Sequence, residues 1–313
     1  MSGDYAKPLL RVRVNDRYRV IYDTLDGLNW TEGTTEDNLE YFTHNIEADY
    51  YFKRSYNQLV AEHAPAHCKV YPLGLNIPFT PEGRYQKSLK ERGIELLKDS
   101  SVVSKFYNTD FFRSRDFEAY PVPSTPNKVL LLARLWNPAH VSSAHLKIER
   151  EKINSNRIEC IRACRSELGD QFTGGLQDDS FSRSLAPDLL APLSLTKRSN
   201  FLQAVKTHTV CIATTGLHDS IGWKVGEYVA ASRAIVSEPL RYQLPGDFAD
   251  GKNYLSYNDK TELVNNIRTL LDNRTTLSNM MRRNFDYYHA NVRPDVLVLN
   301  TLWKIYEDSE STR

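Results

Sequence analysis

Lys224 and Glu227 are the two residues whose types and spacing suggest chemistry most directly. They stand three positions apart in a segment that predicts a helix, so both side chains lie on one helical face near its first turns. A lysine in that place can neutralise a phosphate group, and a carboxylate can accept hydrogen bonds from two ribose hydroxyls. The same spacing also fits a solvent-exposed ion pair without any ligand, and both interpretations stay open at this point.

The loop in front of this pair is suited to an anion. Thr209 to Ala213 is a short apolar run typical of a strand, and the turn formers after it end in two good N-cap residues, Asp219 and Ser220, where a helix is predicted to begin. A helix N-terminus behind a glycine-bearing loop presents free backbone N–H groups and the positive end of the helix dipole, which suit a diphosphate. The candidate contacts in this loop are Thr215, Gly216, His218, Ser220 and Gly222.

The wider segment resembles a known family. Residues 216–239, GLHDSIGWKVGEYVAASRAIVSEP, and GKNYLSYNDKTELVNNIRTLL after them are similar to the C-terminal, donor-binding domain of GT-B glycosyltransferases of the family 1/4-like and exostosin-like type. In the Glu-x7-Glu form of that motif the second acid corresponds to Glu227, the glycine to Gly222 and the first acid to Asp219, where the family usually has Glu. Lys224 stands where the exostosin-like branch usually has Arg. The resemblance covers roughly residues 125 to 300.

The resemblance implies an α/β, GT-B-like fold with two Rossmann-type domains facing a cleft, the N-terminal one small or abridged. Residues 120–127, YPVPSTPN, hold three prolines in eight residues and are the best linker in the chain. We therefore expect an N-terminal acceptor-side domain over 1–122, a nucleotide-sugar-binding domain over 123–290, and a C-terminal helix over 291–313 that packs back toward the first domain. The alternation of strand and helix patterns after residue 128 predicts a parallel sheet. Tyr85 to Ser100 predicts an amphipathic helix.

Two further donor-site candidates lie at strand ends. Lys128 to Leu135 is the near-continuous apolar run of a strand buried on both faces, and Arg134 stands near its end. In GT-B transferases a basic residue there often contacts the donor diphosphate; the companion lysine found a few residues later in the family is missing here. A surface arginine at a strand end is the alternative. Phe172 to Leu176 predicts a strand with two glycines, and at Gly175 the backbone could approach a ligand closely.

The first half of the chain offers acids for the acceptor side. Tyr18 to Asp23 predicts a strand, and the loop DTLDGLNWTEG follows it at the place where α/β sheets bind ligands. Asp26 and His44 are the candidate catalytic bases, while Asp219 would lie beside the donor sugar in a retaining enzyme. Inversion is the favoured outcome. A polar turn with self-capping carboxylates is the alternative reading of DTLDG.

Composition limits the class of protein. The 313 residues are 41% apolar with a formal charge of +1, so no global field gathers nucleic acid or an anionic membrane. No apolar run approaches the ~18 residues of a membrane span and no signal peptide is evident, which predicts a cytoplasmic protein. The four cysteines show no C-x-x-C spacing and fit a reducing compartment. His63, His67 and Cys68 make a weak metal motif, because Pro65 interrupts the helical spacing and a fourth ligand is missing.

These observations favour a glycosyltransferase that moves a sugar from a nucleotide-sugar donor, with UDP favoured and GDP second, to a hydroxyl of a glycan or glycoprotein acceptor. No Asp-x-Asp occurs in the chain, so metal-independent chemistry without a cofactor is expected. The alternative is a non-catalytic nucleotide-binding or assembly protein that keeps only the donor domain, and a homodimer or partner subunit fits either case. A dinucleotide oxidoreductase and a P-loop NTPase are disfavoured, because G-x-G-x-x-G after a strand and G-x-x-x-x-G-K-[ST] are both absent.

Overall fold

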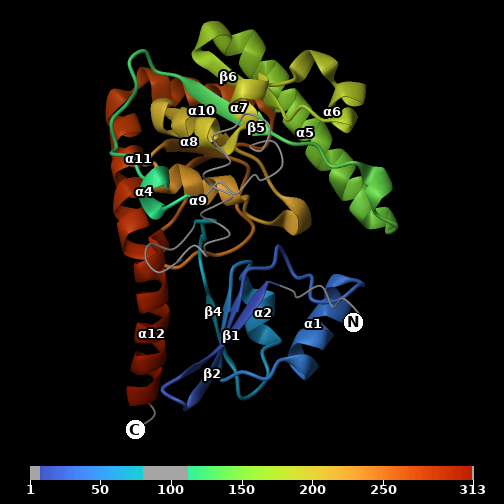
Figure 1. The fold of residues 1–313 in the computed structure, drawn as a ribbon, viewed down its shortest axis with the longest axis vertical. Coiled ribbons are helices and arrows are strands. Elements are labelled where there is room, and N and C mark those ends of the chain that lie inside the picture. Colours follow the sequence, from blue (N-terminus) through green and yellow to red (C-terminus); the bar gives the residue numbers. More distant parts are fainter. Residues whose placement is uncertain (1–7, 80–111, 312–313) are drawn as a thin grey trace, which may run out of the picture.

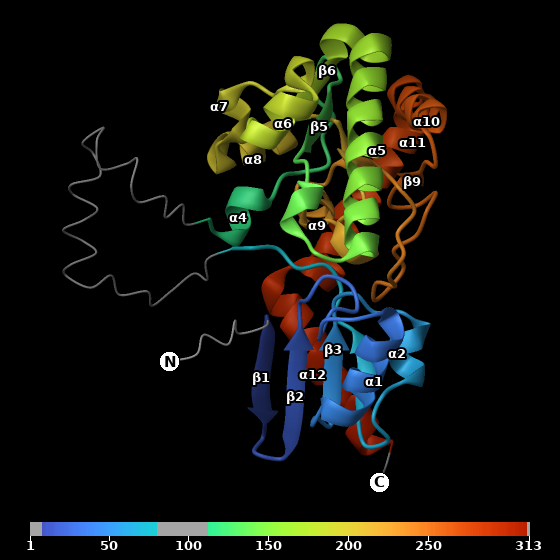
Figure 2. The ribbon, with the colours of Figure 1, turned by 90° about the vertical axis from the view of Figure 1, so that its right-hand side faces the viewer.

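The computed structural model describes residues 8–79 and 112–311, so the helix predicted over Tyr85–Ser100 lies outside the described residues. The described chain forms a small and a large α/β domain, each built on its own sheet, with one long C-terminal helix beside both (Figure 1). Turning the molecule by 90° separates the two sheets clearly (Figure 2). The GT-B-like α/β arrangement predicted from the sequence is confirmed, and the sheet of its first domain has four strands within residues 8–79.

The small domain is a four-stranded sheet in the order β1-β2-β3-β4. β1 pairs with β2 in antiparallel fashion, whereas β2, β3 and β4 run parallel. Two helices connect the parallel strands, because parallel neighbours need a crossover. The elements are β1 (Leu9–Val14), β2 (Tyr18–Asp23), α1 (Thr35–Asn45), β3 (Tyr50–Lys53), α2 (Gln58–Glu62) and β4 (Lys69–Pro72).

Side chains of the small sheet alternate between two apolar layers, as the period of a strand requires. Ile21 and Tyr51 face α1 and α2, where they pack with Phe42 and Val60. Their chain neighbours point to the opposite face, which is covered by the C-terminal helix α12 (Pro294–Glu310) through Ile305. Both faces of this small sheet are therefore buried, one of them by a helix from the other end of the chain.

The large domain alternates strands and helices along the chain. Its three central strands are short apolar runs that are buried almost completely, as expected for a parallel sheet covered on both faces. Its elements are α4 (Ser114–Phe117), β5 (Val129–Ala133), α5 (Ala144–Leu168), β6 (Phe172–Leu176), α6 (Ser180–Leu185), α7 (Leu193–Thr196), α8 (Arg198–Thr207), β7 (Val210–Ala213), α9 (Trp223–Ala230), β8 (Ala234–Ser237), β9 (Leu255–Ser256), α10 (Lys260–Asp272) and α11 (Arg274–Tyr287).

The strand order of the large sheet defines where a ligand can bind. The order is β6-β5-β7-β8-β9, and Leu190 adds a parallel bridge to Leu176 beyond β6. Numbered along the chain, with the Leu190 bridge as the third strand, this is the 3-2-1-4-5-6 order of a Rossmann sheet. The sequence order of the strands, but not their direction, reverses between β5 and β7. Helices cover both faces, with α8 and α9 on one and α5 and α10 on the other. The carboxyl ends of β5 and β7 therefore border the crevice in which such sheets bind nucleotides.

The segment before β5 belongs to the large domain in space. Phe117 packs in the large-domain core, and Ala119 N–H donates to Ala230 O. Arg233, only 1% exposed, donates to the carbonyls of Tyr120 and Val122. Residues 114–122, which fall within the predicted first domain, thus contact the large domain, because a buried guanidinium with five donors satisfies carbonyls of this segment.

Candidate functional site

The carboxyl edges of the two sheets meet in a narrow cleft. Arg54 follows β3 and donates to Ile221 O, which follows β7. Gln243 N–H donates to Tyr56 O at 2.8 Å, and His218 Nε2 lies 3.3 Å from Asn29 Nδ2. Loops from both domains therefore touch directly in this structure.

The loop after β7 departs from the sequence prediction. The helix α9 begins at Trp223 with Gly222 as its N-cap, three residues later than expected from Asp219 and Ser220. His218 and Asp219 both adopt left-handed backbone angles, with φ of 58° and 54°, so the chain cannot enter a helix there. A short loop closes instead, in which Gly216 N–H donates to the carbonyl of Ser220 at 2.9 Å. Asp219 is exposed, while Ser220 is buried.

Two carboxylates already occupy N–H groups of this loop. Thr215 N–H donates to Glu238 Oε2 and His218 N–H to Glu149 Oε1, both at 2.6 Å. Backbone N–H groups that gather acids in this way favour negative charge. Both N–H groups are thus satisfied by side chains of the protein itself, which the sequence did not indicate.

Glu227 and Lys224 lie below this loop on α9, and each has a partner outside the pair. Glu227 is 2% exposed; its Oε1 accepts a hydrogen bond from Arg198 at 2.6 Å, and its Oε2 has no hydrogen-bond partner in the described chain. Lys224 Nζ donates to Leu132 O at the end of β5. The interpretation of these residues as a solvent-exposed ion pair is therefore wrong. A buried carboxylate oxygen without a donor calls for a ligand hydroxyl or water.

The charge around Lys224 is also unbalanced. The pKa of Lys224 is lowered to about 8, chiefly by burial. The nearby cations Arg157, Arg198 and Arg134 also lower this pKa, whereas Glu227 raises it. Like charges gathered in a poorly solvated place repel one another unless an anion joins them. Burial and the neighbouring cations therefore both disfavour the charged form of Lys224.

Arg157 is a site residue that the sequence did not indicate. It lies on α5, is 8% exposed, and donates to Arg134 O at 2.5 Å, to Thr214 Oγ1 at 3.0 Å and to Thr215 O at 2.9 Å. It thereby holds the loops after β5 and β7 at a fixed separation. The side chain of Arg134 is exposed, with its guanidinium 3.9 Å from the centre of the Trp136 ring. Arg157 supplies a second cation where the expected companion lysine is missing.

Gly175 has a packing role in this structure. A Cβ at this position would lie 2.5 Å from Leu189 O and 2.8 Å from Ala191 N, and its φ is +158°. The backbone that approaches Gly175 closely therefore belongs to the protein, so the glycine is accounted for without a ligand.

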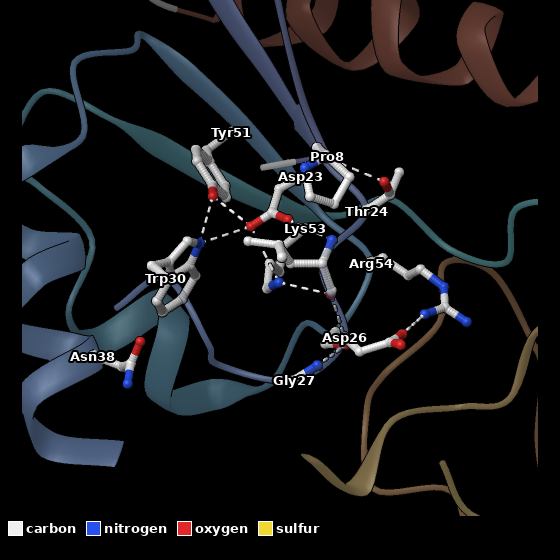
Figure 3. Close-up of polar contacts among 12 residues, drawn as sticks. Pro8, Asp23, Thr24, Asp26, Gly27, Trp30, Asn38, Tyr51, Lys53 and Arg54 are labelled. Carbon is white, nitrogen blue, oxygen red and sulfur yellow. Dashed lines mark hydrogen bonds and ion pairs between the residues drawn. The ribbon is translucent and has the colours of Figure 1, made fainter. Parts of the chain in front are cut away.

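On the small domain, the two acids of the DTLDG loop have different environments (Figure 3). Asp23 is completely buried and binds Lys53 Nζ at 3.1 Å, Trp30 Nε1 at 2.8 Å and the Tyr51 hydroxyl at 2.5 Å. Asp26 is 41% exposed at the cleft and forms an ion pair with Arg54. The buried Asp23 supports the loop, and Asp26 is the acid that the loop presents.

His44, the other candidate base, lies apart from Asp26. It lies in the last turn of α1, is exposed, and its Nδ1 is 2.9 Å from Glu40 O. Because β2 and β3 are parallel, α1 must run back from the carboxyl edge of the sheet to the start of β3. His44 therefore lies at the edge away from Asp26, a reversal that its position in the sequence did not indicate.

The space in the cradle is small. A cavity of about 10 Å³ is lined by loop and strand-end residues of the large domain. Ligand pockets usually measure roughly 300–1,000 Å³, so a ligand of that size would enter only if these loops moved apart. The lining residues are Thr214, Thr215, Asp219, Ser220, Ile221, Gly222, Val225, Ser237, Pro239 and Leu240.

The described residues contain neither a metal-binding cluster nor a membrane-spanning helix. Within residues 8–79 and 112–311, no three His, Cys, Asp or Glu side chains gather in a way that could hold a metal ion. None of the helices described has the length and apolar character needed to cross a membrane. Independence from metal stays a prediction.

Comparison with known proteins gives structural likeness at low identity. No family model and no curated protein matches the chain. HepE from Anabaena with UDP and glucose is 14% identical with a TM-score of 0.48, over 93% of this chain and 71% of that one. The C-terminal domain of the group 1 glycosyl transferase LpcC from Francisella tularensis is 10% identical (TM-score 0.39; 57% and 96% covered). UDP-GlcNAc 2-epimerase from Neisseria meningitidis is 14% identical (TM-score 0.44; 82% and 62% covered).

The buried Asp23–Lys53 pair leads to a stability prediction. Lys53→Met leaves the Asp23 carboxylate buried without its cation and should lower the free energy of unfolding by about 3–5 kcal/mol. Adding Asp23→Asn removes the stranded charge and should recover part of this loss. Urea unfolding measures both effects.

The matched control is Lys252→Met, whose ion pair with Asp247 is exposed. It should cost less than about 1 kcal/mol. Equal unfolding midpoints for Lys53→Met and the wild type would contradict a structural role for the buried pair.

Proposed function

We propose that this protein is a glycosyltransferase that binds a nucleotide diphosphate sugar at the crevice outside β5 and β7 and transfers the sugar to a hydroxyl group. One observation carries the proposal: Glu227 is buried with a carboxylate oxygen that lacks a partner in the described chain, three residues from a lysine inside a cationic crevice. A ribose hydroxyl beside a diphosphate supplies both missing partners, a donor for the oxygen and negative charge for the cations.

The proposed roles follow the geometry of the crevice. Glu227 Oε2 would accept from the ribose. Lys224, Arg157 and the backbone at the start of α9 would favour the diphosphate, because the positive end of the helix dipole adds to the side-chain charges. Arg134, exposed at the end of β5, would contact its outer oxygens. UDP is the favoured nucleotide and GDP the second.

The reaction requires a base on the opposite side of the donor. In the inverting route that we favour, Asp26 takes the proton of the acceptor hydroxyl, whose oxygen bonds to the anomeric carbon as the bond from that carbon to the diphosphate breaks. The crevice cations stabilise the charge that develops on the departing diphosphate, so no metal ion is needed for that task. In a retaining enzyme, Asp219 would instead lie beside the donor sugar. The acceptor class is a glycan or glycoprotein hydroxyl.

A second candidate function is a nucleotide-binding or assembly protein without transfer activity. The close loop contact favours it, because a Cβ at Gly27 would lie 2.2 Å from His218 Cβ, which leaves little room for an acceptor between these loops. Such a protein would bind a nucleoside diphosphate but release no sugar from its derivatives.

Calorimetric titration with UDP, GDP, ADP and NAD, in EDTA and then with Mg²⁺, tests the donor site. One nucleoside diphosphate should bind without metal, and Glu227→Gln should weaken it about tenfold or more, because the ribose loses a charged acceptor. Glu307→Gln on the exposed side of α12 is the control and should bind as the wild type. Binding of none of the four compounds, or equal affinity in Glu227→Gln, would sink the assignment.

Lys224 should make nucleotide affinity depend on pH. Its ammonium is protonated below its pKa of about 8 and neutral above it. Affinity for UDP should therefore stay level near pH 7, where the terminal phosphate of UDP is already ionised, and fall as the pH rises beyond 8. Lys224→Arg, which stays charged, should remove this fall. A wild-type profile that is flat from pH 7 to 9.5 would rule Lys224 out as the titrating contact.

Asp26→Asn separates binding from transfer. An amide cannot take the acceptor proton, so transfer from the sugar derivative of the bound nucleotide should fall about 100-fold or more, while nucleotide affinity should change less than about twofold. Chromatography of the released nucleoside diphosphate measures the rate. Glu36→Gln, an exposed acid on α1, is the control, and wild-type transfer by Asp26→Asn would exclude Asp26 as the base.

A further inference from the structure

Arg54 is a buried cation that belongs to both domains at once. It follows directly after β3, and its side chain is 4% exposed. One terminal nitrogen, Nη1, donates to Asp26 of the small domain, and the other, Nη2, donates to Ile221 O of the large domain. Its guanidinium carbon lies 4.9 Å from the centre of the Trp223 ring. Figure 3 shows the guanidinium turned toward Asp26 at the end of the small-domain loop.

The two contacts on the large domain define the start of α9. Ile221 and Trp223 flank Gly222, the N-cap of that helix. Lys224 and Glu227 follow on the same helix. Any shift of α9 relative to the small domain therefore changes the surroundings of the Arg54 guanidinium.

Hydrogen bonds within the small domain surround the Asp26–Arg54 ion pair (Figure 3). Lys53 Nζ donates to Leu25 O at 3.0 Å, and Leu25 N–H donates to Asp23 Oδ1 at 2.7 Å. Gly27 N–H donates to Ser55 Oγ at 2.9 Å. The residues on either side of Asp26 and of Arg54 are thus bonded to one another, so the Asp26–Arg54 ion pair is part of the small domain, and Ile221 O and the Trp223 ring are its contacts on the large domain.

We infer that Arg54 is a positioning residue that closes the cleft and orients Asp26 against the start of α9. The closure part stands on the contacts alone, whereas the orientation of a reacting carboxylate rests on the proposed function. A guanidinium suits this task better than an ammonium, because its planar fork reaches two acceptors in fixed directions. Arg54 itself does not touch the reacting atoms in this assignment.

The distance between the domains tests the closure. Spin labels at Glu40→Cys and Asp170→Cys, both exposed, report on the two domains, while the four native cysteines are buried. Arg54→Met should lengthen the mean distance and widen its distribution. Arg19→Met, which removes an exposed cation of the small domain, should leave both unchanged.

Kinetics and a conservative variant test the positioning. Arg54→Met should bind UDP within about twofold of the wild type but lose about tenfold or more in transfer rate, because a displacement near 1 Å can cost up to 100-fold. Arg54→Lys should restore part of the closed distance and part of the rate. A purely structural role would instead change nucleotide affinity and rate together.

The results separate failure of the Arg54 inference from failure of the proposed function. An unchanged distance distribution in a folded Arg54→Met overturns the inference even if the wild type binds UDP. Failure of the wild type to bind any nucleoside diphosphate removes the proposed function but leaves the distance result valid. If Arg54→Met does not fold, Trp223→Ala removes a ring that is 39% exposed and should also widen the distribution. An unchanged distance distribution in a folded Trp223→Ala overturns the inference as well.

Discussion

An ionised side chain stays buried only when other groups replace its water, and this requirement shapes the whole cleft. Lys53 binds a carboxylate and a loop carbonyl, Arg54 spans two domains, and Arg157 joins the loops after two strands. Arg233 secures the connection that enters the large domain. Each cation gathers acceptors from segments far apart in the chain. The position of the candidate site therefore depends on buried charge as much as on apolar packing.

The large domain was predictable because its signals are local. Apolar runs of strand length, separated by helical periodicity, repeat from residue 128 onward and fold into the expected parallel sheet. Gly222, Lys224 and Glu227 are neighbours in the chain, so their common helix follows from spacing alone. The start of that helix was misplaced because His218 and Asp219 take left-handed angles, which only the closed loop around them determines. Two good capping residues do not fix the start of a helix when tertiary contacts determine the backbone angles.

The remaining site residues carry no signal in the sequence. Arg157 is one of several charged residues on a 25-residue helix. It reaches the loops after β5 and β7 because that helix passes the ends of these strands. Arg198, Glu238 and Arg54 likewise reach the crevice or cleft from separate elements. His44 lies apart from Asp26 for the converse reason, because α1 runs back from the edge of the sheet at which Asp26 lies. The sequence predicts which residues of one segment share a face. It does not predict which residues of separate segments meet, because the packing of the fold determines that.

The last helix has a consequence for how the protein is made. The sheet face with Val20, Tyr50 and Phe52 is covered by Ile305, near the end of the chain, and Tyr22 and Thr301 share a hydrogen bond of 2.7 Å. On a ribosome the strands emerge first, and at typical rates the helix follows on the order of ten seconds or more later. Until then, one apolar face of the nascent domain is open to other chains. The small domain, whose strands precede the large domain in the sequence, is therefore completed only after α12 has been made.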